Sequence, residues 1–451
     1  MHRYLFAAMV VLSLGGFSRA ADRLVVHEWG TFTSLQDEQG NAIGGINTDD
    51  EPVPGFVHQV IPGLLFPPTL AASPGSKAAP EGDPDVTMRL ETPVLYFHLP
   101  KGQSEPVKVD VDVAFRGGWL TQYFPDARAS VDSPTTRAGT SLDVNLLRLG
   151  ERLTAKTVGR LSWRGLTLNS EQGQMPLTAD RVWTSPRAVD STAVAEGAER
   201  EQFLFYRGVG HVDSPLRVMR EADGNVLTVH DAAAGLAMGN IWLVDIRADG
   251  STAFRSVAGV TPTVDATATE FSEGDYSREN RGRLREAMRE SLVEDGLFGD
   301  EADALLNTWG RSYFQNPGER LFFLVPQAWT DAVLPLGLSI DADVKRVMVG
   351  RVELVTPAQR GILKRMALWS SLKSTDLKAV TAAMTRLQND PAKREAYDAL
   401  AGGHGNLADL GVPVPWVYAN YLALGRFRTP LLRNEISKSS ALLSLSTQLT
   451  P

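Results

Sequence analysis

Val107-Lys-Val-Asp-Val-Asp-Val-Ala-Phe115 is the stretch that decides the fold class. Its apolar residues stand at every second position up to Phe115, with Lys108, Asp110 and Asp112 between them. Because successive side chains of a β-strand point to opposite faces, this alternation predicts an antiparallel strand with one buried face and one face in water.

The same period of two dominates from Arg23 to about Gly259. Thr92–His98 and Phe203–Tyr206 are apolar on both faces, so we expect these strands to be central in their sheet. Together with the turn residues between them, the alternating segments favour an antiparallel β-sandwich-like domain over residues 22–260. The other alternating segments are Leu24–Thr33, Arg160–Leu168, Val226–His230 and Ile241–Arg247.

After Thr261 the apolar spacing becomes helical, which predicts a mixed, helix-rich portion over residues 261–436 and a loosely ordered tail over 437–451. The fold class is therefore α+β. We expect the strand Arg320–Val325 to return toward the sandwich. The segments behind this interpretation are the helical stripes Leu284–Leu292 and Ala302–Tyr313, the strand Val347–Val355, and the helix starts Thr356-Pro357 and Asp390-Pro391.

The N-terminus has the features of a secretory signal peptide over residues 1–20. Arg3 precedes an apolar run, Tyr4–Phe17, and Ser18-Arg19-Ala20 places small residues where a signal peptidase cleaves, after Ala20. A membrane anchor is the alternative, but the run is shorter than the roughly 20 residues that span a bilayer. We expect a periplasmic or extracellular protein with no transmembrane segment after cleavage.

The composition narrows the classes of partner and chemistry. Removing Arg3 and Arg19 changes the formal net charge from -8 to -10, which gives no general attraction for nucleic acid. The chain has no cysteine, so disulfides, thiolate metal sites and a cysteine nucleophile are excluded. Gly208-Val-Gly210 lacks the third glycine of a dinucleotide loop, so no nucleotide cofactor is expected.

The segment His27-Glu28-Trp-Gly-Thr-Phe-Thr33 contains the first candidate site residues. On a strand His27 and Glu28 point to opposite faces, and Glu28 shares the apolar face of Val26 and Phe32. A carboxylate there must be paired or protonated. Glu28 is therefore either a structural partner of a buried arginine or a general acid/base or metal ligand.

A second group of candidates comes from two other strands. Arg89 and Glu91 lie on one strand face, and Tyr206-Arg207 ends another strand. If these strand ends converge with Glu28, the two glutamates would be catalytic, and Arg89, Tyr206 and Arg207 would bind substrate. The alternative is a structural Arg–Glu network that ties the strands together.

A divalent metal is a further possibility, for which His27 and His211 are the candidate ligands. No two histidines have the i,i+2 or i,i+4 spacing of a local chelate, so any site must be built from distant residues. Hydrogen-bonded structural roles are the alternative for each histidine.

Aromatic residues suggest a binding surface of a different class. Trp119, Tyr123 and Phe124 follow Gly117-Gly118, and exposed rings at this point could stack on the sugars of a polysaccharide. Core packing at a sheet end is the alternative.

The chain resembles a family of uncharacterised secreted proteins from environmental bacteria, over residues 27 to about 357. The resemblance implies export but carries no activity. It rests on His27-Glu-Trp-Gly-Thr-Phe-Thr-Ser34, Met88-Arg-Leu-Glu-Thr-Pro-Val94, Phe203-Leu-Phe-Tyr-Arg-Gly-Val-Gly210 and Arg346-Val-Met-Val-Gly-Arg-Val352.

The sequence leaves two candidate functions open. One is an exported hydrolase or metal-assisted enzyme acting on an envelope or imported polymer. The other is a non-catalytic carbohydrate-binding or envelope-structural protein.

Overall fold

The computed structural model describes residues 23–47, 51–60, 83–132, 142–143, 153–221, 226–231 and 235–367, and shorter stretches after them. These stretches are 378, 382, 385–386, 389–393, 420–421 and 423–436. The expected signal peptide, most of the Pro67–Pro84 linker and the tail over 437–451 lie outside the described residues. The fold is mixed α/β, with more strand than helix; a strand-rich N-terminal part precedes a C-terminal part in which helices and strands alternate.

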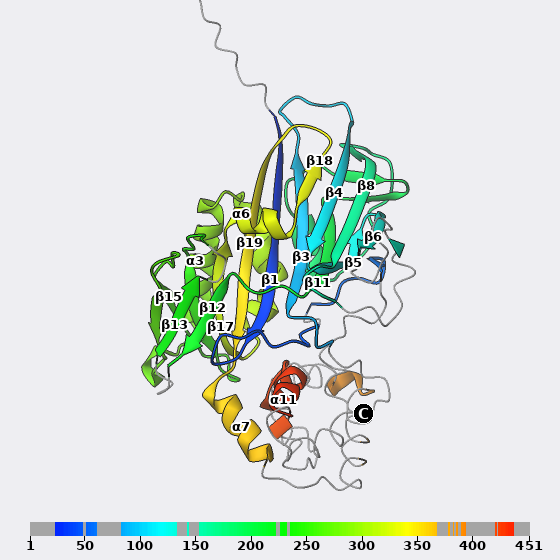
Figure 1. The fold of residues 1–451 in the computed structure, drawn as a ribbon. Helices are drawn as coiled ribbons and strands as arrows, with labels where there is room; N and C mark the ends of the chain where they lie inside the picture. Colours follow the sequence, from blue (N-terminus) through cyan, green and yellow to red (C-terminus); the bar gives the residue numbers. More distant parts are fainter. Residues whose placement is uncertain are drawn as a thin grey trace, which may run out of the picture.

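One large sheet organises the molecule, and its centre is β1 (Leu24–Gln36) between β3 (Met88–His98) and β19 (Ala342–Leu354) (Figure 1). β1 pairs with β3 antiparallel and with β19 parallel. Beyond β3 the order is β11 (Leu204–Gly210), β5 (Gly118–Phe124), β8 (Val158–Leu168), β9 (Val194–Glu196) and β10 (Glu199–Glu201). Beyond β19 the order is β17 (Gly318–Val325), β14 (Ile241–Ile246) and β15 (Thr252–Val257).

Further strands join this sheet or form a small second one. β4 (Val107–Arg116) pairs with β8 and with β18 (Leu336–Leu338), and a three-stranded sheet has the order β12–β13–β16. Its strands are β12 (Leu216–Arg220), β13 (Val226–Asp231) and β16 (Ala266–Thr269). The remaining short strands are β2 (His58–Gln59), β6 (Arg128–Asp132) and β7 (Leu142–Asp143).

The two faces of the large sheet have different coverings. Apolar residues of β4, β8, β12 and β13 share one core with one face of β1, β3 and β11. Helices cover the other face, where Trp29, Tyr96 and Phe205 pack against them. These helices are α2 (Arg181–Arg187), α3 (Asn280–Glu294), α4 (Gly299–Thr308) and α5 (Gly310–Phe314). Since β1 is covered on both faces, its polar side chains must find partners inside the protein.

Within the described residues, three further α-helices lie outside this layer. α6 (Gln327–Val333) lies against β19, and α7 (Pro357–Ala367) and α11 (Arg428–Ile436) lie beyond one end of the sheet (Figure 1). Arg360 of α7 binds Glu38 and Glu435, which ties both of these helices to the loop after β1.

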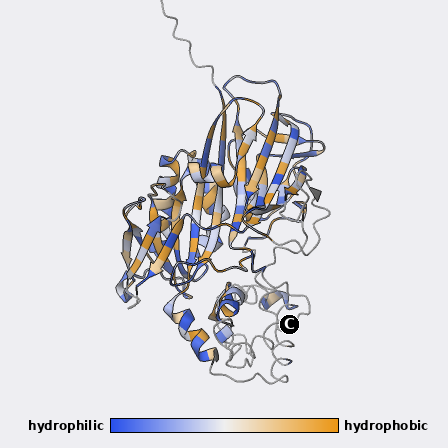
Figure 2. Cartoon of the chain, viewed as in Figure 1, coloured by the Kyte–Doolittle hydropathy of each residue, from blue (hydrophilic) through white to orange (hydrophobic). Residues whose placement is uncertain are grey.

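Most of the elements expected from periodicity are present. β4 has the predicted alternation of buried and more exposed residues, and bands of apolar and polar residues alternate along many strands in Figure 2. The segments expected to be central, in β3 and β11, are buried along nearly their whole length. The helical stripe over 302–313 is interrupted at Trp309, where α4 ends and α5 begins. Asp390-Pro391 begins a 3-10 turn over Pro391–Lys393, and the residues directly after this turn lie outside the described part of the chain.

The expected sandwich of two separate sheets is not confirmed. β4 and β8 are joined by hydrogen bonds to the large sheet, through the pairing of β8 with β5. The large sheet also crosses residue 260, where the sequence pattern predicts a domain boundary, because β17 and β19 pair with β14 and β1. Hydrophobic periodicity identifies strands but carries no information about which strands become neighbours.

A substitution at Gly350 of β19 tests how tightly the centre of the sheet is packed. It pairs with Phe323 of β17, and a Cβ at Gly350 would lie 2.1 Å from the Phe323 ring. We expect Gly350→Ala to lower the free energy of unfolding by about 1–3 kcal/mol, because the buried ring must move. Urea denaturation measures this. Gly337→Ala is the control, since its nearest neighbour would lie 3.7 Å away, and an equal loss in both variants would contradict the packing argument.

Candidate metal centre

Glu28 is completely buried, on the face of β1 that it shares with Val26. It accepts hydrogen bonds from Tyr206 and from Arg346, which is its direct cross-strand neighbour on β19. Arg346 also binds Asp331 at 2.8 Å and the carbonyl oxygen of Leu334 at 2.7 Å. Burial and the neighbouring Glu28 charge raise the pKa of Tyr206 well above its usual value, so the phenol stays protonated and donates. The buried arginine partner that the structural interpretation of Glu28 requires is therefore present.

Arg89 and Glu91 form a second buried pair, at 2.8 Å, on the helix-covered face. Glu91 also lies 3.3 Å from Arg351 of β19 and accepts a hydrogen bond from Thr33 at 3.0 Å. The expected structural Arg–Glu link between strands is present here as well.

Arg207 is buried on the same face as the Arg89–Glu91 pair. Its guanidinium donates to Thr92 Oγ1 at 2.9 Å and 3.0 Å and to the Glu51 carbonyl at 2.7 Å, and it lies 5.8 Å from the Trp309 ring. Thr92 has φ +45°, which is rare for a β-branched residue, and this strained position is where Arg207 binds it.

The expected convergence of Glu28, Glu91, Tyr206 and Arg207 on one pocket is wrong. Tyr206 and Arg207 are consecutive strand residues, so they point to opposite faces of the sheet. Glu28 and Tyr206 lie on the face shared with β4, whereas Glu91 and Arg207 lie under the helices. A layer of strand backbone therefore separates the two groups.

The structure brings together three side chains that can hold a metal ion, namely His27 of β1, His98 of β3 and Glu301 of α4. One potential ligand atom from each lies within 4.8 Å of the other two. His27 Nδ1 is 2.7 Å from Glu301 Oε2, and His98 Nε2 is 2.9 Å from Glu301 Oε1. Among the described residues, no other group of three or more histidines and acids has this geometry.

Glu301 is positioned by the start of its helix. Its Oε2 accepts a hydrogen bond of 2.7 Å from the Phe298 backbone N–H, which is the capping-box arrangement. Burial disfavours the charged carboxylate, but hydrogen bonds from His27 and His98 outweigh burial and hold the pKa of Glu301 below its usual value. The group is thus an ionised carboxylate facing two imidazoles.

The three side chains lie close enough together to hold a small transition-metal ion once their donor atoms rearrange. Bonds of about 2.0–2.1 Å in a tetrahedral zinc site place neighbouring ligand atoms roughly 3.3 Å apart. The two His–Glu separations, 2.7 Å to Oε2 and 2.9 Å to Oε1, involve different oxygens of Glu301. One oxygen must therefore turn toward both imidazoles, and these contacts must widen by about half an ångström. Such an expansion is within reach of rotations about the side-chain bonds, and it leaves one coordination position for water or another ligand.

The cluster lies close to the surface. His27 and Glu301 are buried, whereas the side chain of His98 is 15% exposed. The Phe298 ring covers this edge, with its centroid 4.6 Å from the His27 ring and 4.9 Å from the His98 ring, and Phe298 is itself 47% exposed. A small ligand approaching the cluster would pass beside Phe298.

The other candidate residues lie elsewhere. His211 is outside the metal cluster, in a cleft described below. Trp119 and Phe124 are buried and so do not form an exposed aromatic platform. Tyr123 is half-buried and stacks on His58, with ring centroids 5.5 Å apart.

Sequence reasoning identifies one member of the cluster and misses two. His27 is a candidate ligand from the sequence, but His98 follows it by 71 positions, and Glu301 by 274. The pairing of Val25 with His98 and of His27 with Tyr96 puts both histidines on one face of adjacent strands. No spacing within the sequence signals this contact, because it depends on the order of the strands and on the position of α4.

Comparisons with known proteins do not add a family to this description, since no protein-family model and no curated protein matches the sequence. Within the described residues, none of the helices combines the length and apolar character needed to span a membrane.

Glu28→Gln tests the structural role of the Glu28–Arg346 pair. We expect the free energy of unfolding to fall by about 3 kcal/mol, because the variant leaves the buried guanidinium without its main counter-charge. Chemical denaturation measures this. Asp112→Asn is the control, since Asp112 and its partner Arg164 are each about half exposed and such pairs contribute less than about 1 kcal/mol. Unchanged stability of Glu28→Gln would restore Glu28 as a catalytic candidate.

Proposed function

We infer that this chain is an exported, metal-dependent protein whose centre consists of His27, His98 and Glu301. In this proposal it acts as a hydrolase or other metal-assisted enzyme on an envelope or imported polymer. The observation that carries the proposal is the convergence of two imidazoles and one carboxylate from β1, β3 and α4 within 4.8 Å.

The donor set supports this class of chemistry. Imidazole nitrogen with carboxylate oxygen suits zinc and other first-row divalent ions, and two histidines with one glutamate form a common set in catalytic zinc sites. With three protein ligands, one position remains where the ion can lower the pKa of a bound water and make it a nucleophile. The partly exposed His98 edge is on the side from which such a water would exchange.

Metal binding is tested on protein prepared without chelators or an affinity tag. We expect about one equivalent of zinc or another first-row ion, and a free energy of unfolding that rises by about 2.7 kcal/mol at a free metal concentration 100 times the Kd. Glu301→Gln and His98→Ala should lose both effects. His58→Gln, at a half-exposed histidine paired with Glu199, is the control. A metal-free parent protein whose melting does not respond to added metal would refute the proposal.

The open coordination position distinguishes an enzyme from a structural site. In the cobalt(II)-substituted protein, a small anion such as azide should change the visible absorption spectrum if it can replace the solvent ligand. A spectrum that does not respond would indicate a metal with a structural role only. It would favour the alternative, a non-catalytic carbohydrate-binding or envelope-structural protein.

Export is proposed from the N-terminal sequence, with Arg3 before the apolar run Tyr4–Phe17 and small residues at 18 and 20. When the full chain is expressed with its own N-terminus in a Gram-negative host, we expect periplasmic protein that begins at Ala21. N-terminal sequencing and intact mass measure this. A full-length chain retained in the cytoplasm would contradict the proposal.

A further inference from the structure

A cleft of about 750 Å³ lies at the opposite end of β1 from the metal centre. Its walls come from the end of β1 and the loop after it, the start of β3, the segment after β11, and strands β12 and β13. Gln36 lines the cleft and lies nine positions after His27 along the strand, which corresponds to about 30 Å. The cleft is therefore a separate site, and it does not depend on the proposed metal.

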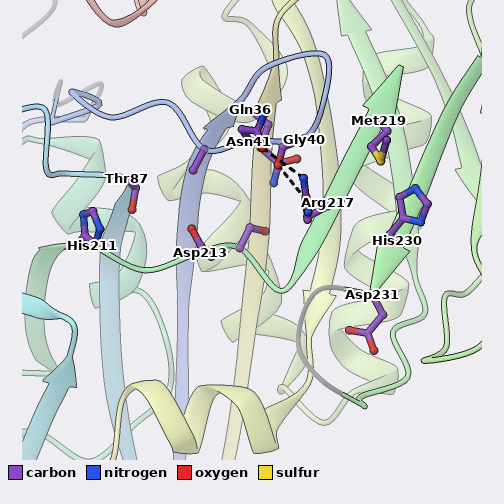
Figure 3. A pocket seen from close by; sticks show the side chains of 12 residues that line it. Gln36, Gly40, Asn41, Thr87, His211, Asp213, Arg217, Met219, His230 and Asp231 are labelled. Atoms are coloured by element: carbon purple, nitrogen blue, oxygen red, sulfur yellow. Dashed lines mark hydrogen bonds between the residues drawn. The ribbon is translucent and has the colours of Figure 1, made fainter. Parts of the chain in front are cut away.

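Figure 3 shows the side chains that line this cleft. Asp213 lies in this view between His211 on one side and His230 and Asp231 on the other. Arg217 reaches from β12 toward the loop after β1. The volume lies within the range of about 300–1,000 Å³ typical of small-molecule sites.

His211 presents a hydrogen-bond acceptor to the cleft. Its Nδ1 is 2.8 Å from the carbonyl oxygen of Asp85. A carbonyl oxygen can only accept, so Nδ1 carries the proton of this bond. In the neutral imidazole Nε2 then has the free lone pair, and no described residue forms a hydrogen bond with it. The Asp85 contact thus fixes the tautomer in which His211 accepts from a ligand.

Asp213 adds a carboxylate that can accept hydrogen bonds from a ligand. It is exposed, and within the described part of the chain it forms no hydrogen bond or ion pair. Its two oxygens can accept from adjacent hydroxyl groups of one ligand.

Arg217 can donate hydrogen bonds to a ligand, but some of its N–H groups already donate to the protein. Its Nε donates to the Gly40 carbonyl at 3.3 Å, and its Nη2 donates to the Gln39 carbonyl at 3.1 Å and to Asn41 Oδ1 at 3.4 Å. The two contacts to Gly40 and Asn41 are drawn as dashed lines in Figure 3. Because Nε and Nη2 already donate within the protein, Arg217 cannot form a side-on pair of hydrogen bonds with a ligand carboxylate. Nη1 and its two N–H groups remain available to donate to a ligand.

The hydrogen-bond donors and acceptors of the cleft favour a ligand that carries hydroxyl groups. A hydroxyl group donates to Asp213 or His211 Nε2 and also accepts from Arg217. An anionic ligand would meet the Asp213 and Asp231 carboxylates without a bidentate arginine in return. Of the residues that line the cleft, only Ala42 and Met219 have apolar side chains, so a lipid is a poor match.

We propose that the cleft between β1, β11, β12 and β13 binds a neutral mono- or disaccharide. Asp213 and His211 Nε2 accept hydrogen bonds from its hydroxyl groups, and Arg217 donates one. This surface differs from the aromatic residues that the sequence suggested for polysaccharide binding.

Isothermal titration calorimetry on the whole mature protein tests the proposal, with glucose, N-acetylglucosamine, maltose and cellobiose as probes. We expect millimolar or tighter binding of at least one sugar. Asp213→Asn should weaken this binding about tenfold, because a charge-assisted hydrogen bond becomes a neutral one. His211→Asn should weaken it similarly while its amide N–H keeps the bond to Asp85, so its melting temperature should match that of the parent.

Two control variants show whether a loss of sugar binding is specific to the cleft. Glu171→Gln removes a carboxylate whose side chain is 93% exposed and which does not line the cleft, so it should bind the sugar like the parent protein. Glu301→Gln should also bind normally, which distinguishes this proposal from the metal proposal. Absence of binding to all four sugars would overturn the proposal. Binding of the zwitterion alanyl-alanine in their place would do the same, as would sugar binding unaffected by both cleft variants.

Discussion

The pairing of β1 with both β3 and β19 is the constraint on which the rest of the structure depends. These pairings put a strand from the start of the chain next to a strand more than 300 residues later, and both faces of β1 are covered. A strand in this position has no access to water for its polar side chains. His27, Glu28 and Thr33 must therefore each be satisfied by protein groups, and every partner found for them comes from a distant element.

The buried ion pair Glu28–Arg346 carries a desolvation cost, and it helps to specify the register of β1 and β19. Removing two charges from water is expensive, and a matched apolar pair is often at least as stable. The pair does specify register, because the two residues are direct neighbours across β1 and β19. A slip of one residue would turn Glu28 toward the helices and separate it from Arg346. This register role gives the buried pair a structural contribution of its own.

The same alternation that buries Glu28 on one face brings His27 to the other, where α4 presents Glu301. The metal candidate thus depends on contact between two layers, the sheet and a helix, and a bound ion would link them. The saccharide cleft is built differently, from loops and strand ends at the far end of β1. Strand ends leave backbone and side-chain groups accessible, which is why open polar sites form there more readily than along the buried middle of the sheet.

The sequence by itself determined local features: the strands with period two, the centrality of β3 and β11, and the placement of His27 and Glu28 on opposite faces. Each of these follows from backbone geometry within a few residues. Only the tertiary structure decided that Arg346 would pair with Glu28 and that His98 and Glu301 would lie beside His27. It also decided which layer of the protein Tyr206 and Arg207 would each contact. The physical reason is that side-chain direction is a local property of a strand, whereas the identity of its neighbours depends on how the whole chain buries its apolar surface.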